Sequence, residues 1–331
     1  MKRIIWFFLI ISSLLLLISC ELLVKAPVKP TVHVLVVALD YQNSSIKNLY
    51  GTITDAVEMA AALNQRASIM QVPMETTMML QEGSSTTRTD SHYPSRANIL
   101  AKISQIGSEM AAEDLFVVYY SGHGVGSEYD YDNPNRGDIV TAYTGSESYK
   151  TITTAEMNQA LSQSNGRVLL LMDSCYSGHH IQAYPDGYSS WITLVDGYDG
   201  NIFYLTAASD TQLSWEDDVD GSSSIHKHGL FTYHFLQALG WSHFKVDEGS
   251  PDDYVQGTFF YSVDGIENSH PYQGGMNSDG TVPAQRGSFI SMYDVQRYIS
   301  RALLGEAALF AIQTTTGTPG PRDVVLFDAA W

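Results

Sequence analysis

The chain has 331 residues, of which 44% are hydrophobic and 16% charged, and its formal net charge is −18. These proportions are typical of a folded globular protein and exclude a largely disordered chain. So acidic a protein is expected to repel nucleic acid and anionic lipid and to attract basic ligands, although the same charge is equally explained by plain solubility.

The N-terminus has the pattern of an export signal. Lys2 and Arg3 precede a nearly unbroken apolar run from Ile4 to Leu17, and the chain then reaches Cys20 through small and apolar residues. A charged start, a short apolar core and a small residue before the cut are typical of a secretory signal. The alternative is a single membrane-spanning helix, but the run is shorter than the about 20 residues that such a helix needs.

With a cysteine directly after the cut, this segment resembles the lipobox of bacterial lipoproteins. The resemblance implies that residues 1–19 are removed as a signal peptide, that Cys20 is lipidated, and that residues 20–30 tether the fold to the lipid. The protein is then exported and lipid-anchored to a bacterial cell membrane, on its periplasmic or surface side. The inner and outer membrane are not distinguished by these residues.

From residue 31 onward, apolar runs of strand length alternate with segments of helical periodicity. Such alternation indicates an α/β fold with a mostly parallel central sheet flanked by helices. We expect one domain over residues 31–331, with an irregular insert at about 249–285, where Gly, Asp, Ser and Tyr dominate. The expected strands are 31–39, 72–80, 115–120, 168–172, 202–207 and 324–327, and the expected helices are 54–65, 94–110, 153–162, 229–239 and 292–304.

Two of these strands lead directly into motifs that carry chemistry. The strand at 115–120 is followed by Ser121-Gly122-His123-Gly124, and the strand at 168–172 by Asp173-Ser174-Cys175-Tyr176-Ser177-Gly178. Sites in parallel sheets lie at the carboxyl ends of the strands, so the histidine and the cysteine are expected at one edge. A thiol beside an imidazole is a typical nucleophile and base pair.

Cys175 has no intrachain disulfide partner if Cys20 carries lipid, because the chain has only two cysteines. The same count excludes a cysteine-based zinc site, which needs several ligands. The alternative is that Cys175 is an ordinary buried small residue, as many cysteines are. The polar, turn-forming residues on both sides of Cys175 argue against this alternative.

The order strand, Ser-Gly-His-Gly, helix, strand, Asp-Ser-Cys-x-Ser-Gly resembles that of the caspase-like cysteine peptidases (clan CD, peptidase family C14), and above all the metacaspases and their bacterial relatives. The similarity extends over roughly residues 31–239. It implies a caspase-like (caspase-hemoglobinase) fold and the activity of a cysteine endopeptidase. One departure is Tyr176, which stands where metacaspases usually carry a histidine.

The resemblance also implies roles for individual residues. Cys175 is the nucleophile, His123 the general acid and base, and the backbone N–H groups of Gly124 and Cys175 form the oxyanion hole. Asp55, Ser121 and Asp173 match the pocket that accepts Arg or Lys before the cut bond. The competing interpretation makes Asp55 a helix cap and Asp173 an acceptor for local backbone N–H groups.

This chemistry requires no cofactor. Calcium is a candidate ligand because some metacaspases bind it through clustered aspartates. This chain has Asp130, Asp132 and Asp138 in one loop, and a second acidic run from Glu216 to Asp220. Carboxylate oxygens suit calcium, but a solvated acidic loop is the simpler interpretation, and no metal ligand is assigned.

The expected partners are a protein or peptide substrate with a basic residue before the cut, and the membrane through the lipid, but no nucleic acid. Two other functions are compatible with the motifs. One is a catalytically silent caspase-like binding module on the cell surface, and the other is a different cysteine hydrolase or acyltransferase on the same fold.

Overall fold

The computed structural model of the chain describes most of the sequence and leaves the predicted signal peptide, Cys20 and nearly all of the tether outside the described residues. No helix in the described part combines the length and the apolar character that a membrane crossing needs. The residues described are 29–84, 90–126, 133–142, 150–180, 202–217, 227–243, 257–263, 266–272, 274–276, 281–302, 312–314 and 324–331.

A six-stranded central sheet organises the molecule, in the order β16-β7-β6-β3-β1-β2. Five of its strands are parallel, and only β16 runs antiparallel, at the edge beside β7. This confirms the predicted α/β class with a mostly parallel sheet. The strands are β1 (Val32–Leu39), β2 (Met74–Gln81), β3 (Leu115–Ser121), β6 (Arg167–Asp173), β7 (Ile202–Thr206) and β16 (Ile312–Thr314).

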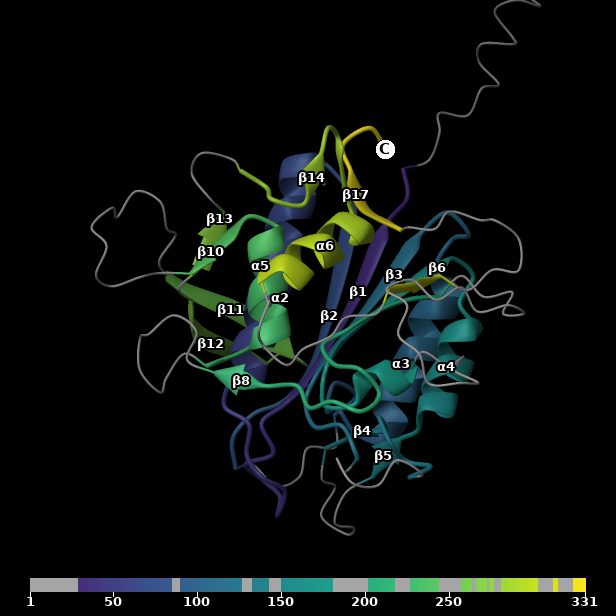
Figure 1. Ribbon diagram of the computed structural model, residues 1–331, viewed down its shortest axis with the longest axis vertical. Helices are drawn as coiled ribbons and strands as arrows, with labels where there is room; N and C mark the ends of the chain where they lie inside the picture. Colours follow the sequence, from purple (N-terminus) through teal and green to yellow (C-terminus); the bar gives the residue numbers. More distant parts are fainter. Residues whose placement is uncertain are drawn as a thin grey trace, which may run out of the picture.

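Helices cover both faces of this sheet, which is why its inner strands are continuous apolar runs (Figure 1). Along β1, Val34 and Val36 pack into one apolar layer, and Leu35 and Val37 into the other. The first layer contains α2, α5 and α6, and the second contains α3 and α4. Their bounds are α2 (Thr52–Met70), α3 (Arg96–Glu109), α4 (Thr154–Ser162), α5 (Leu230–Ala238) and α6 (Met292–Ala302).

Two of the helices begin at side-chain caps that the sequence supplies. Ser95 accepts a hydrogen bond from the amide of Asn98 at the start of α3. Thr153 and Glu156 form a reciprocal capping box at the start of α4. These caps mark the start of the helices that precede β3 and β6 in the chain.

The expectation of an irregular insert at 249–285 is wrong for much of that segment. There, β11 (Gly257–Val263) and β12 (Ile266–Tyr272) form an antiparallel hairpin, and β13 (Gly274–Met276) pairs with β10 (Trp241–His243). The strand-forming run Thr258-Phe259-Phe260-Tyr261 outweighs the glycine-rich composition around it.

Short strands form small sheets separate from the central sheet. The predicted last strand is confirmed as β17 (Val325–Asp328), but it pairs with β15 (Phe289–Ser291) in a small separate sheet that also contains β14 (Gln285–Arg286). This small sheet lies at the end of the molecule where β1 begins (Figure 1). Two short antiparallel pairs and one 3₁₀ turn complete the described structure: β4 (Ile139–Val140) with β5 (Thr151–Ile152), β8 (Glu216–Asp217) with β9 (His228–Gly229), and η1 (Ser177–His180).

Candidate active site

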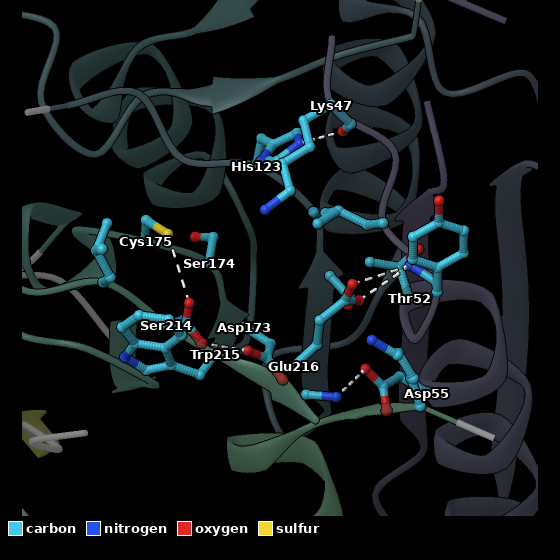
Figure 2. A pocket seen from close by; sticks show the side chains of 17 residues that line it. Lys47, Thr52, Asp55, His123, Asp173, Ser174, Cys175, Ser214, Trp215 and Glu216 are labelled. Atoms are coloured by element: carbon cyan, nitrogen blue, oxygen red, sulfur yellow. Dashed lines mark hydrogen bonds between the residues drawn. The ribbon is translucent and has the colours of Figure 1, made fainter. Parts of the chain in front are cut away.

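The two motifs leave the sheet at neighbouring positions. The last residues of β3 and β6, Ser121 and Asp173, are paired in the parallel register. The chain after each strand therefore enters the same region, and His123 and Cys175 both line one cleft of about 420 Å³ (Figure 2). Ser121 and Asp55 line this cleft as well.

His123 is held by backbone groups rather than by a carboxylate. Its Nε2 lies 2.7 Å from the carbonyl oxygen of Lys47, and its amide donates to the hydroxyl of Tyr41. A carbonyl oxygen can only accept, so Nε2 carries the proton and Nδ1 keeps its lone pair. Burial lowers the pKa of His123, which favours the neutral imidazole near neutral pH.

Cys175 lies at a sharp turn just after β6. The next residue, Tyr176, has φ = 56°, in the left-handed region, and its amide donates to the carbonyl of Gln212. The thiol of Cys175 is 3.6 Å from the carbonyl oxygen of Ser214, and burial raises its pKa. Cys175 lines the cleft and belongs to neither apolar layer, unlike an ordinary core cysteine.

The backbone at Gly124 touches the backbone at Cys175. A Cβ atom added to Gly124 would lie 2.0 Å from the carbonyl oxygen of Cys175 and 3.3 Å from its nitrogen. No side chain fits this space, so the position requires glycine. The backbone of Gly124 therefore packs directly against the carbonyl group of Cys175.

Asp55 is fully buried, and its partners come from a distant part of the sequence. Its Oδ1 lies 2.9 Å from Nδ1 of His228, and its Oδ2 accepts from the amide of Gly229 at 2.9 Å. The cap of α2 is Gly51, without a side-chain hydrogen bond, so the interpretation of Asp55 as a helix cap is wrong. Burial, followed by the charge of Asp173, raises the pKa of Asp55.

Asp173 has a comparable set of contacts. Its Oδ1 accepts from the hydroxyl of Ser214 at 2.8 Å, and its Oδ2 from the hydroxyl and the amide of Thr232 at 2.7 and 3.2 Å. The amide belongs to α5, so the interpretation of Asp173 as an acceptor for local backbone N–H groups is wrong. Burial raises the pKa of this carboxyl too, against the effect of these hydrogen bonds.

Sequence reasoning missed two residues that shape the cleft. Glu216 lines it, and its carboxylate accepts from the amides of Tyr50 and Gly51 at 3.0 and 2.9 Å (Figure 2). His228 holds Asp55 from behind the cleft. The sequence signals for them were indirect, since Glu216 stood out only as the start of an acidic run considered for calcium, and His228 directly precedes Gly229.

The two aspartate-rich loops are only partly described. Asp130, Asp132, Asp218 and Asp220 lie outside the described residues. Within the described part, no three carboxylate, imidazole or thiol side chains gather as a metal site would need. Asp138 is buried, and one of its carboxylate oxygens accepts from the amide of Thr154 at 3.2 Å.

Comparison with known proteins places this geometry in context. Residues 33–184 match the family model of the metacaspase, peptidase C14 domain. This match includes both motifs and supports the caspase-like C14 cysteine peptidases as the family. No curated protein matches the chain. A crystal structure of the protein GSU0716 from Geobacter sulfurreducens is similar, with 16% identity, a TM-score of 0.50, and coverage of 88% of this chain and 96% of that one. At this identity, the similarity shows the fold alone.

Proposed function

We propose that this chain is a cysteine endopeptidase in which Cys175 is the nucleophile and His123 the general acid and base. The main support for the proposal is the parallel register of β3 and β6. Because the two strands end side by side, the histidine motif and the cysteine motif both reach the same cleft. The C14 match supports the same reaction class.

The resting protonation states of Cys175 and His123 support a stepwise mechanism. At rest the pair is a thiol and a neutral imidazole, because burial raises the pKa of Cys175 and lowers that of His123. As sulfur bonds to the substrate carbonyl carbon, the thiol proton passes to Nδ1 of His123. The imidazolium then protonates the leaving amine, which leaves a thioester on Cys175. Water attacks the thioester, His123 takes a proton from it, and the acid product leaves with the thiol restored.

Two backbone features assist this sequence. The carbonyl of Lys47 holds Nε2–H of His123 and stabilises the imidazolium when it forms. The amides of Gly124 and Cys175, two residues whose backbones lie close together, are proposed to donate to the oxyanion of the tetrahedral intermediate. Donors fixed in this way act on charge that exists only in the transition state.

We further propose that the cleft prefers Arg or Lys before the cut bond. Asp55, Ser121 and Asp173 line its wall as expected, and Glu216 adds a third carboxylate. Burial raises the pKa of Asp55, and the nearby charge of Asp173 raises it further, so a substrate cation would relieve the repulsion between the two carboxyl groups. The described lining of the cleft contains no arginine, although it includes Lys47 and Lys227, so an Asp peptide is a necessary comparison for this proposal.

The proposed location is a bacterial cell membrane, on its periplasmic or surface side, with Cys20 lipidated and protein or peptide as the substrate. The chemistry above uses only groups of the protein. The assay is run with and without calcium, because the chain carries two aspartate-rich loops.

The full chain, purified in detergent, tests these proposals on peptides that differ only in having Arg, Lys or Asp before the cut, with and without calcium. We expect turnover of the Arg and Lys peptides, and Cys175→Ala should lower it by about 10³-fold or more. Cys20→Ser is the matched control, since it removes the other cysteine and should abolish membrane attachment while leaving turnover intact.

The outcomes separate the alternatives. Turnover of the Asp peptide alone would overturn the pocket assignment, and full activity of Cys175→Ala would overturn the nucleophile. A chain that reacts with a thiol-directed probe but turns over no peptide would indicate a different cysteine hydrolase or acyltransferase. A chain that does neither would indicate a binding module.

A further inference from the structure

A second cleft, of about 300 Å³, lies between the β14 segment and α6, and the peptidase chemistry does not use it. Three arginines line it: Arg286 from β14, and Arg297 and Arg301 from α6. The two helical arginines are four residues apart and therefore lie on the same face of α6. The phenol ring of Tyr298 lines the same space.

The charge of this cleft is opposite to that of the protein. The chain has 36 acidic residues and only 18 lysines and arginines, yet the cleft holds three arginines and one carboxylate, Asp294. That carboxylate is already engaged, because it pairs with Arg286 and accepts from the hydroxyl and the amide of Ser291. In the described part of the chain, neither Arg297 nor Arg301 has a carboxylate partner.

An arrangement of like charges with so little compensation is unfavourable unless an anion joins it. Guanidinium groups offer paired N–H donors that match the oxygens of phosphate and carboxylate groups. Arg297 and Arg301 on one face of α6, with Arg286 on the β14 side of the cleft, suit a tetrahedral oxyanion, because its oxygens can accept from more than one side. We propose that this cleft binds a phosphate group.

The position of the cleft suggests two sources for such a group. The sheet that contains β14 lies at the end of the molecule where β1 begins, away from β8 and the catalytic cleft (Figure 1). If Cys20 carries lipid, as proposed above, the short tether that precedes β1 keeps this end near the membrane. The phosphate then belongs to a lipid headgroup or to a small soluble phosphate compound, and the chemistry of recognition is the same.

The first experiment is calorimetric titration of the full chain in neutral detergent with inorganic phosphate. We expect saturable binding that weakens as salt is added, and the double variant Arg297→Ala/Arg301→Ala should weaken it by about tenfold or more. Lys29→Ala/Lys102→Ala is the matched control, because it removes the same charge from other exposed positions. The double variant Arg297→Lys/Arg301→Lys keeps the positive charge but loses the paired N–H donors of the guanidinium groups. Its affinity for phosphate should lie between that of the alanine variant and that of the lysine control.

The second experiment places the full chain in phosphatidylcholine nanodiscs with and without phosphatidylglycerol, and measures hydrogen exchange over residues 285–301. Protection that requires phosphatidylglycerol and the two arginines identifies a lipid headgroup, whereas phosphate binding without such protection identifies a soluble ligand. The proposal is overturned if neither probe binds, or if the lysine control loses as much as the arginine variant. Peptidase turnover is measured in parallel, and its absence would not affect either outcome.

Discussion

Nδ1 of His228 lies 2.9 Å from Oδ1 of Asp55, although 173 residues separate the two in sequence. Both side chains are only 1% exposed, and Asp55 lines the catalytic cleft whereas His228 does not. This pair joins the start of α2 to the start of α5, so the shape of the proposed specificity pocket depends on it.

Replacing His228 by alanine should destabilise the protein, because a buried carboxyl group loses one of its hydrogen-bond partners. We expect the free energy of unfolding to fall by about 1–3 kcal/mol in urea denaturation. His234→Ala, six residues further on and outside the cleft, is the control and should cost less. Equal losses in the two variants would show that the Asp55 pair has no special role.

Glu216→Gln should change which substrates the cleft prefers. The glutamine keeps an oxygen for the amides of Tyr50 and Gly51 but removes the negative charge. The KM of an Arg peptide is expected to rise about tenfold, which corresponds to about 1.4 kcal/mol of binding, while a peptide with a neutral residue before the cut is unaffected. Glu109→Gln, on α3, is the control. An equal rise in KM for both peptides would show that Glu216 holds the loop at Tyr50 and Gly51 and does not set specificity.

Gly124→Ala should separate transition-state stabilisation from reactivity of the thiol. The new methyl group would clash with the carbonyl oxygen of Cys175 and displace the proposed oxyanion-hole amide. We expect kcat/KM to fall by about 10²–10³-fold, while iodoacetamide still alkylates Cys175 at a rate close to that of the parent chain. Unchanged kcat/KM would remove Gly124 from the oxyanion hole.

The pH profile of kcat/KM should reflect a pair that is neutral at rest. Burial lowers the pKa of His123, so the imidazole loses its proton below the usual value of 6.5 and activity should rise through that lower pH. The pKa of Cys175 is raised, so the thiol stays protonated across the neutral plateau. An acid limb centred at or above pH 6.5 would contradict the lowered pKa of His123, and steady-state rates across pH 4–9 measure where this limb lies.

Asp138 should make stability depend on pH. Burial raises its pKa from 3.8 to about 6, so the folded state binds this proton more tightly than the unfolded state. Stability is therefore expected to fall as pH rises from about 4 to 6, by at most about 3 kcal/mol at 1.36 kcal/mol per pH unit. Asp138→Asn should flatten this dependence in urea denaturation, whereas Glu113→Gln, at an exposed position, should not.

The parts of this fold that the sequence predicts well are those with local signals. Strands such as β3 and β6 are continuous apolar runs because both faces of the sheet are covered, and their ends are marked by the polar motifs. The first helix was expected over 54–65 and spans Thr52–Met70, since its ends have no side-chain cap to mark them.

What could not be predicted depends on contacts between distant segments. Nothing near Asp55 in the sequence indicates that its partners are His228 and Gly229, and nothing near Glu216 indicates that it holds the loop at Tyr50 and Gly51. These contacts arise only when α2 and α5 pack on the same face of the sheet. The cleft of arginines likewise depends on the packing of β14 against α6.

The antiparallel pairing of β8 with β9 places Glu216 opposite Gly229, so the two ends of the connection at residues 218–226 are fixed beside each other. Each end has its own attachment: Glu216 to the amides of Tyr50 and Gly51, and His228 to the buried carboxyl of Asp55. A single break of the chain anywhere between these ends would release neither of them. The wall of the cleft would survive as two strands held by separate anchors, and a nicked molecule would keep the same geometry as an intact one.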